Sequence, residues 1–206
     1  MTRSTTISDR PPSARIKLLE AARSVIRTKG YSGTTVDDLC VAAGVTKGAF
    51  FHHFESKEAL GVAAADYWSE TTAALFADAP YHRHADPLDR VLGYIDFRAD
   101  LIDGPLEAFT CLVGTMVQET YATNPPIRDA CRASIFDHAA SLEADIAAAM
   151  KLYGVKRLSP RSLALHTQAV LQGGFILAKA GDGAEFASES IAHLKRYIEL
   201  LFRPQK

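Results

Sequence analysis

Residues 34–57 read TTVDDLCVAAGVTKGAFFHHFESK, and this stretch decides how the N-terminal part of the chain folds. Thr35 can cap a short helix, and Asp38, three residues on, makes a variant of the capping box. Gly44 follows where a left-handed residue would end that helix, and Thr46 can cap a second one. Two short helices joined by a tight turn that contains glycine are typical of a DNA-binding helix-turn-helix.

A longer helix is expected on each side of this stretch. Ser13 can cap the helix before it, and Gly30 is a natural stop. Ser56 can cap the helix after it, which should continue until Pro80. The first helix has apolar residues at spacings of three and four, which indicate one buried face. These are Ile16, Leu19, Ala22 and Ile26.

The rest of the chain also predicts helices, and sustained strand-like alternation is absent from the sequence. We expect them at about 87–103, 105–122, 125–153, 160–180 and 185–203, separated by glycine- and proline-containing turns. The fold prediction is therefore all-α, with about nine helices.

We predict three segments. Residues 1–13 form a flexible arm whose arginines either touch DNA phosphates or are simply disordered, 14–60 form the helix-turn-helix DNA-binding domain, and 61–206 form an effector-binding and dimerisation domain.

Charge is distributed unevenly along the 206 residues. The net charge is −1, but residues 1–60 hold nine Lys and Arg against six Asp and Glu. This local excess suits a DNA-facing N-terminal end. Three irregularly spaced cysteines do not make a disulfide framework, and neither a signal peptide nor an apolar run of membrane-spanning length is present. These features predict a cytoplasmic protein without a membrane segment.

The last two expected helices carry a repeat of apolar residues at alternating steps of three and four. Such helices from two chains could form a four-helix dimer interface, or both stripes could face the core of their own chain. The candidate interface residues are Leu163, His166, Val170, Gly173, Leu177, Ile191, Leu194 and Ile198.

A second apolar group either lines an effector cavity or belongs to the core. It comprises Phe109, Cys111, Leu112, Val113, Met116 and Tyr121. His82, His84 and Asp86 could bind a metal, but a solvated connector explains them better, so neither metal nor cofactor is expected. The sequence lacks the nucleophile-elbow, P-loop and zinc-protease motifs, and we therefore do not expect an enzyme.

Residues 42–60, AAGVTKGAFFHHFESKEAL, resemble the signature of the TetR/AcrR family of transcriptional regulators. The resemblance covers residues 14–68 and extends to the layout of the remainder. It implies a homodimer that binds a palindromic operator through one helix-turn-helix per chain. It also implies that an unknown small-molecule effector, bound in the C-terminal body, releases repression.

The family motif implies DNA-contacting roles for eight positions. These are Thr35, Thr46, Lys47, Gly48, Ala49, Phe51, His52 and Lys57. Thr35, His52 and Lys57 would contact the DNA backbone, while residues 46–49 would enter the major groove. Where the family usually has Tyr, this chain has Phe51, which lacks the hydroxyl that could bond a phosphate.

Cys111 and its neighbours also resemble the branch of the family that includes the electrophile-sensing regulator NemR. Cys111 would then be a sensor, although a buried cysteine often acts as a small apolar residue. The alternative function is a helical ligand-binding or redox-sensing protein with weak or no DNA binding.

Overall fold

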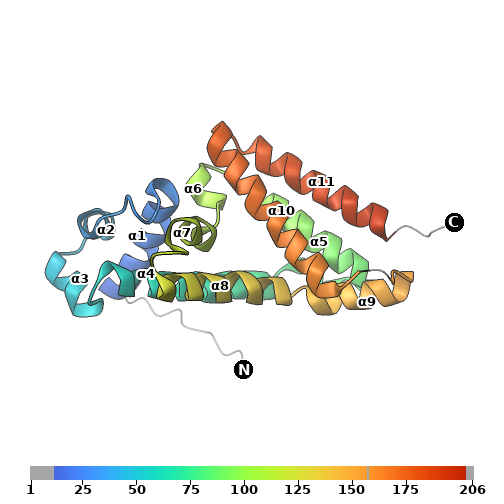
Figure 1. Cartoon of the computed structure of the whole chain (residues 1–206), viewed down its shortest axis with the longest axis horizontal. Helices are drawn as coiled ribbons and strands as arrows, with labels where there is room; N and C mark the ends of the chain where they lie inside the picture. Colours follow the sequence, from blue (N-terminus) through green and yellow to red (C-terminus); the bar gives the residue numbers. More distant parts are fainter. Residues whose placement is uncertain (1–11, 157, 203–206) are drawn as a thin grey trace, which may run out of the picture.

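The computed structural model describes residues 12–156 and 158–202, and these form eleven α-helices and one 3₁₀ helix without a strand (Figure 1). The all-α prediction is confirmed, with two more α-helices than the sequence suggested. The predicted arm at 1–13 lies almost wholly outside the described residues.

Three helices form a compact unit at one end of the molecule, called the head here (Figure 1). They are α1 (Ala14–Lys29), α2 (Val36–Ala43) and α3 (Lys47–His53). Ser13, Thr35 and Thr46 cap them as predicted, each accepting a backbone N–H through its hydroxyl. Gly44 ends α2 with φ of 62°, a left-handed conformation that glycine adopts at little cost.

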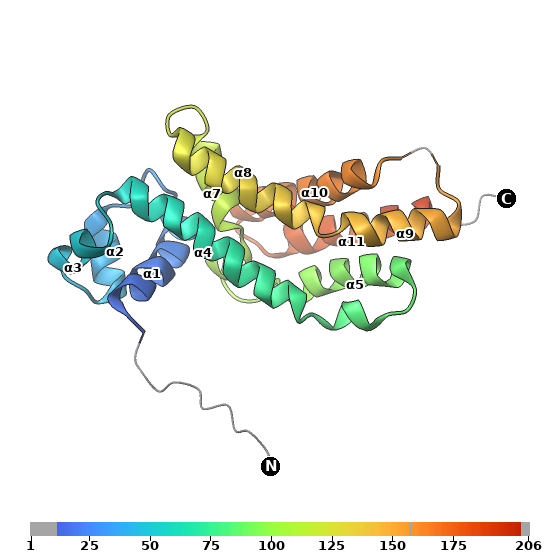
Figure 2. The same cartoon turned by 90° about the horizontal axis from the view of Figure 1, so that it is seen from below.

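Helix α4 (Lys57–Ala77) connects the head to the body (Figure 2). Its 21 residues span about 32 Å at 1.5 Å per residue. Ser56 caps it as expected, and the chain then turns through η1 (Pro80–Arg83) into α5 (Pro87–Asp100).

Two segments expected to be single helices are each divided. The first gives α6 (Leu106–Phe109) and α7 (Leu112–Thr120), because the backbone is extended at Thr110 and Cys111. The second gives α8 (Pro125–Ala140) and α9 (Glu143–Tyr153). Ser141 lies at this break and donates its hydroxyl hydrogen to the carbonyl of His138, a bond that competes with regular helix.

The chain ends with α10 (Pro160–Gly181) and α11 (Glu185–Leu201), which pack together. Figure 1 shows α11 on the side of the body away from α4 and α8, while α10 runs down to pack on α8 and α9. Asp182 makes the turn between α10 and α11 with φ of 53°. Helix α11 also packs on α5, so that its apolar stripe faces the interior of its own chain.

This packing corrects half of the predicted dimer interface. Leu163, Ile191, Leu194 and Ile198 are at most 3% exposed and belong to the core. A core stripe and an interface stripe have the same helical spacing, so the sequence alone could not separate them. The outward stripe on α10 instead contains His166, Val170, Gly173 and Leu177, of which Leu177 is 53% exposed.

Candidate DNA-binding surface and ligand cavity

The start of α3 presents small and polar residues to solvent. Thr46, Lys47 and Gly48 are exposed, and Ala49 is half-buried. The Thr46 hydroxyl accepts the Ala49 N–H at 3.1 Å, which fixes the first turn of the helix. Among the described residues, a side chain at Gly48 would meet only the Thr46 hydroxyl, at 3.7 Å, so their packing does not require a glycine here.

Lys47 is held across the turn by α2. Its Nζ lies 2.8 Å from a carboxylate oxygen of Asp37, and both side chains are more than 60% exposed. The Asp37 carboxylate raises the pKa of Lys47 by accepting its hydrogen bond. Exposed ion pairs contribute little, typically about 0–1 kcal/mol, so an incoming anion can replace Asp37 at small cost.

The start of α2 is a complete capping box. Thr35 accepts the Asp38 N–H at 3.1 Å, and the Asp38 carboxylate accepts the Thr35 N–H at 2.9 Å. Lys29 donates to the same carboxylate at 2.7 Å. These bonds, that of Lys29 first, hold the pKa of Asp38 well below its usual range.

The aromatic residues of α3 divide between core and surface. Phe50 is 0% exposed and Phe54 5% exposed, so both belong to the core. Phe51 is 55% exposed and has its ring edge-on to Phe50, with centroids 5.1 Å apart. His52 is exposed beside it. The exposed ring of Phe51 offers an apolar surface and no hydroxyl.

Lys57, the first residue of α4, is half-buried and makes bonds within the head. Its Nζ donates to the carbonyls of Tyr31 at 3.0 Å and Thr34 at 2.9 Å. It also lies 4.5 Å from the centroid of the Tyr31 ring. Lys57 therefore ties the start of α4 to the turn between α1 and α2, while its predicted phosphate contact stays a prediction.

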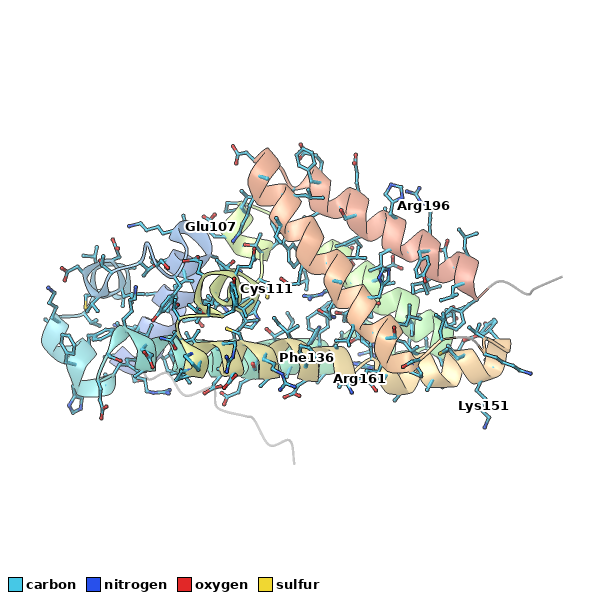
Figure 3. All side chains as sticks on the ribbon, in the orientation of Figure 1. Glu107, Cys111, Phe136, Lys151, Arg161 and Arg196 are labelled. Carbon is cyan, nitrogen blue, oxygen red and sulfur yellow. The ribbon has the colours of Figure 1, made fainter. Side chains whose placement is uncertain are left out.

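A cavity of about 850 Å³ is lined by residues of α1, α4, η1 and every helix from α5 to α10. Phe109, Cys111 and Val113 line it, as the sequence suggested for an effector cavity. Figure 3 shows Cys111 near the centre of the molecule, beside α7. Its Sγ accepts the Gly114 N–H at 3.3 Å, so this thiol caps α7.

The other three residues proposed for the cavity lie elsewhere. Leu112 and Met116 are at most 1% exposed, belong to the core and are not among the lining residues. Tyr121 follows the end of α7 and is 63% exposed. Apolar residues at helical spacing indicate a buried face, but only some residues of that face line the cavity.

Arg27 is a cavity residue that the sequence interpretation missed, because a basic residue in the last turn of a helix is usually solvated. Its guanidinium donates to the carbonyls of Ala108 and Thr110, both at 3.1 Å, and lies 5.2 Å from the Trp68 ring. Burial lowers the pKa of Arg27 to about 10. It joins α1 to the start of α7 across the cavity wall.

Glu119, near the end of α7, makes a second connection between body and head. Its carboxylate accepts the N–H groups of Tyr31 at 3.1 Å and Ser32 at 2.7 Å. Gly30 allows this approach, because a side chain there would lie 2.5 Å from Glu119. Through Arg27 and Glu119, the head is thus bonded to the chain near both ends of α7.

A buried polar network borders the far end of the cavity. The Tyr94 hydroxyl accepts from Gln168 and lies 2.9 Å from Nε2 of His138. Burial lowers the pKa of His138 to about 3, so its ring is neutral near pH 7. Tyr94 therefore donates to His138, and the network satisfies its own central groups.

Within residues 12–156 and 158–202, His, Cys, Asp and Glu side chains form no group of three that could hold a metal ion. His82 instead lies 2.9 Å from the Phe76 carbonyl, and Asp86 caps α5. None of the described helices combines the length and apolar character needed to cross a membrane.

Comparison with known proteins identifies two matching family models. The model of bacterial regulatory proteins of the tetR family matches residues 18–64. The model of the C-terminal domain of LmrA/YxaF-like transcriptional regulators matches residues 87–186. Together they cover the head and most of the body.

Two curated relatives have similar sequences. The HTH-type transcriptional repressor DhaR of a Mycobacterium species is 32% identical over 115 residues, so the chain spans about half, 54%, of that protein. The HTH-type transcriptional regulator LmrA of Bacillus subtilis is 23% identical over 80% of this chain and 86% of its own.

Two solved structures share the fold. A TetR regulator from Chloroflexus aurantiacus has a TM-score of 0.78 and 27% identity, covering 90% of this chain and 94% of its own. The reduced form of E. coli NemR has a TM-score of 0.76, covering 89% and 95%. At 22% identity NemR supports the fold alone, so the NemR-like branch stays a prediction.

Proposed function

Because this chain belongs to the TetR family of transcriptional regulators, we propose that it is a repressor that binds a palindromic operator as a dimer. In this proposal residues 14–60 bind DNA, and 61–206 bind an effector and dimerise. A small molecule in the body cavity releases the operator. The protein acts by binding and not by catalysis.

The observation that carries the proposal is the exposed start of α3, supported on a buried Phe50. Thr46, Lys47, Gly48 and Ala49 there enter the major groove, with Lys47 exchanging Asp37 for guanine or phosphate. The backbone contacts come from the remaining predicted residues, of which Phe51 provides only an apolar one. These are Thr35, Phe51, His52 and Lys57.

The dimer interface in this proposal is the outward face of α10 and α11. Apolar side chains remain exposed there, and an exposed apolar face of this kind favours association. Its members beyond the predicted His166, Val170, Gly173 and Leu177 are Ile176, Phe186, Tyr197 and Leu200. The His166 ring packs on Tyr197 at 5.3 Å and so joins the two helices on this face.

Release of DNA requires that the cavity and the head be coupled. An effector that favours one arrangement of α7 changes the head through Arg27 and Glu119, since each bonds across the boundary. The effector acts only by its difference in affinity for the two arrangements. Cys111 lies on the same wall, and an electrophile that reaches its Sγ would disturb the cap of α7.

Gel-shift assays with the intergenic DNA beside the gene test this function. We expect a salt-sensitive, sequence-specific shift, and we expect Lys47→Ala to weaken it by about 1–3 kcal/mol for a lost base contact. Lys151→Ala is the matched control, because this exposed lysine lies at the opposite end of the molecule (Figure 3).

The competing function, a ligand-binding protein with weak or no DNA binding, is favoured by one feature of the head. Phe51 has no hydroxyl, and Lys57 is engaged by two carbonyls, so two expected phosphate contacts are weakened. Unchanged affinity and base preference in Lys47→Ala would favour this function over repression.

A further inference from the structure

The cavity is bounded by aromatic rings and by three arginines, Arg23, Arg27 and Arg98. Trp68 and Arg27 lie at the end near the head, while Phe76, Tyr81 and Arg98 lie toward α5. Its volume of about 850 Å³ lies within the range of about 300–1,000 Å³ typical of small-molecule sites. The side chains on its wall can therefore indicate the class of molecule that it binds.

Arg98 is the unusual member of this wall. Its Nε is buried and has no hydrogen-bond partner among the described residues. Its guanidinium carbon lies 5.0 Å from the Phe76 ring centroid and 5.8 Å from that of Tyr94. The residue as a whole is half-buried. A positive charge partly removed from water normally has a counter-ion, and aromatic faces supply only part of that stabilisation.

The nearest polar network cannot serve as the counter-ion. His138 is neutral, and the hydroxyl of Tyr94 is already shared between His138 and Gln168. The positive charge of Arg98 itself contributes to the low pKa of His138, after burial. Positive charge at this end of the cavity is thus left without a negative partner.

The acidic residues on the wall do not balance it either. Asp145 forms its ion pair with Arg90 at 2.7 Å, and the Asp137 and Glu70 side chains belong to exposed residues. Within the part of the chain that the structure describes, the ion pairs do not include Arg98. Arg27 adds a second positive charge on the cavity wall, which is buried and held by carbonyls.

We propose that the cavity binds an organic anion with an aromatic ring system, whose acidic group is held by the guanidinium of Arg98. The rings lie against Phe76 and Tyr81 and extend toward Trp68. A guanidinium can bind a planar acidic group through two parallel hydrogen bonds, so it selects an acid over the neutral molecule of the same shape. The inference rests on the proposed function in one respect, that this cavity is the effector site.

Two fluorescent probes of matched shape test the inference without DNA. 8-Anilinonaphthalene-1-sulfonate carries an acidic group, and N-phenyl-1-naphthylamine has the same rings without it. We expect the sulfonate to bind the full-length protein at least tenfold more tightly than the neutral probe. In Arg98→Gln we expect sulfonate affinity to fall about tenfold and neutral-probe affinity to stay within twofold.

Controls separate recognition from damage to the cavity. Arg161→Gln removes an exposed arginine at the start of α10 and should change neither affinity (Figure 3). Arg98→Lys keeps the charge and should retain part of the preference for the anion. If Arg98→Gln misfolds and binds neither probe, the folded Arg98→Lys decides. Loss of its preference for the sulfonate over the neutral probe would overturn the inference, and retention of that preference would support it.

Equal affinity for the two probes in the wild type, or an unchanged preference in Arg98→Gln, would also overturn it. These measurements contain no operator, so their failure leaves the gel-shift result untouched. A protein that prefers the anion and fails to bind any operator fragment would sustain the inference and refute the proposed repressor.

Discussion

Glu119→Gln tests whether α7 joins the cavity wall to the head. The two carboxylate oxygens each accept one backbone N–H, from Tyr31 and Ser32. Glutamine keeps one acceptor oxygen without the charge, and its NH2 group cannot accept the other N–H. Hydrogen bonds to charged groups contribute about 1.5–3 kcal/mol and neutral ones about 1 kcal/mol. Because Glu119 is exposed, solvent screening reduces the difference. We expect the variant to lose about 1 kcal/mol of unfolding free energy, or about 2–4 °C in Tm.

Urea denaturation measures the global effect, and hydrogen exchange of the peptide that contains Tyr31 and Ser32 measures the local one. Exchange there should become faster in Glu119→Gln, because both amides lose part of their protection. Asp66→Asn is the control, since it removes a carboxylate from an exposed position on α4. If the two variants have the same stability and exchange, Glu119 does not join the two parts.

Three further perturbations follow from particular contacts. Asp37→Asn should raise operator affinity several-fold in gel shifts, because it frees Lys47 and removes a negative charge facing DNA; lower affinity would contradict this. Burial lowers the pKa of His138 to about 3 in the folded protein, so the neutral ring stabilises the fold fully above pH 6.5 and this stability is lost as the pH falls toward 3. Between pH 7 and 5, urea denaturation should show that the wild type loses about 2 kcal/mol more unfolding free energy than His138→Gln. Equal losses would refute burial as the cause of the shift. Leu177→Glu changes an exposed residue and should reduce the dimer content in sedimentation velocity. Leu194→Ala changes a core residue and should instead lower the unfolding free energy by about 2–5 kcal/mol. The reverse pattern would exclude the outward face of α10 and α11 as the interface.

Local features of the head were predictable from the sequence. The caps at Thr35 and Thr46 depend on groups three residues away, and Gly44 ends α2 through its own backbone freedom. Such features need no knowledge of the rest of the fold.

Contacts between distant parts of the chain were not predictable. Arg27 bonds to a carbonyl 83 residues away, and Glu119 to an amide 88 residues away. Neither has a local pattern that separates it from a solvated charge. The sequence also left open whether the apolar stripe of α11 faces its own chain. The packing of α11 on α5 decides this, with Leu194 2% exposed and Tyr197 42% exposed.

The central claim is that two heads on one dimer bind two halves of a palindromic operator. Hydroxyl-radical footprinting of the intergenic DNA tests it most directly, with the wild-type protein in excess over the fragment. We expect two protected half-sites in inverted orientation, with centres about one helical turn, or a multiple of it, apart. A single protected half-site, or no protection on any fragment that the protein is given, would contradict it.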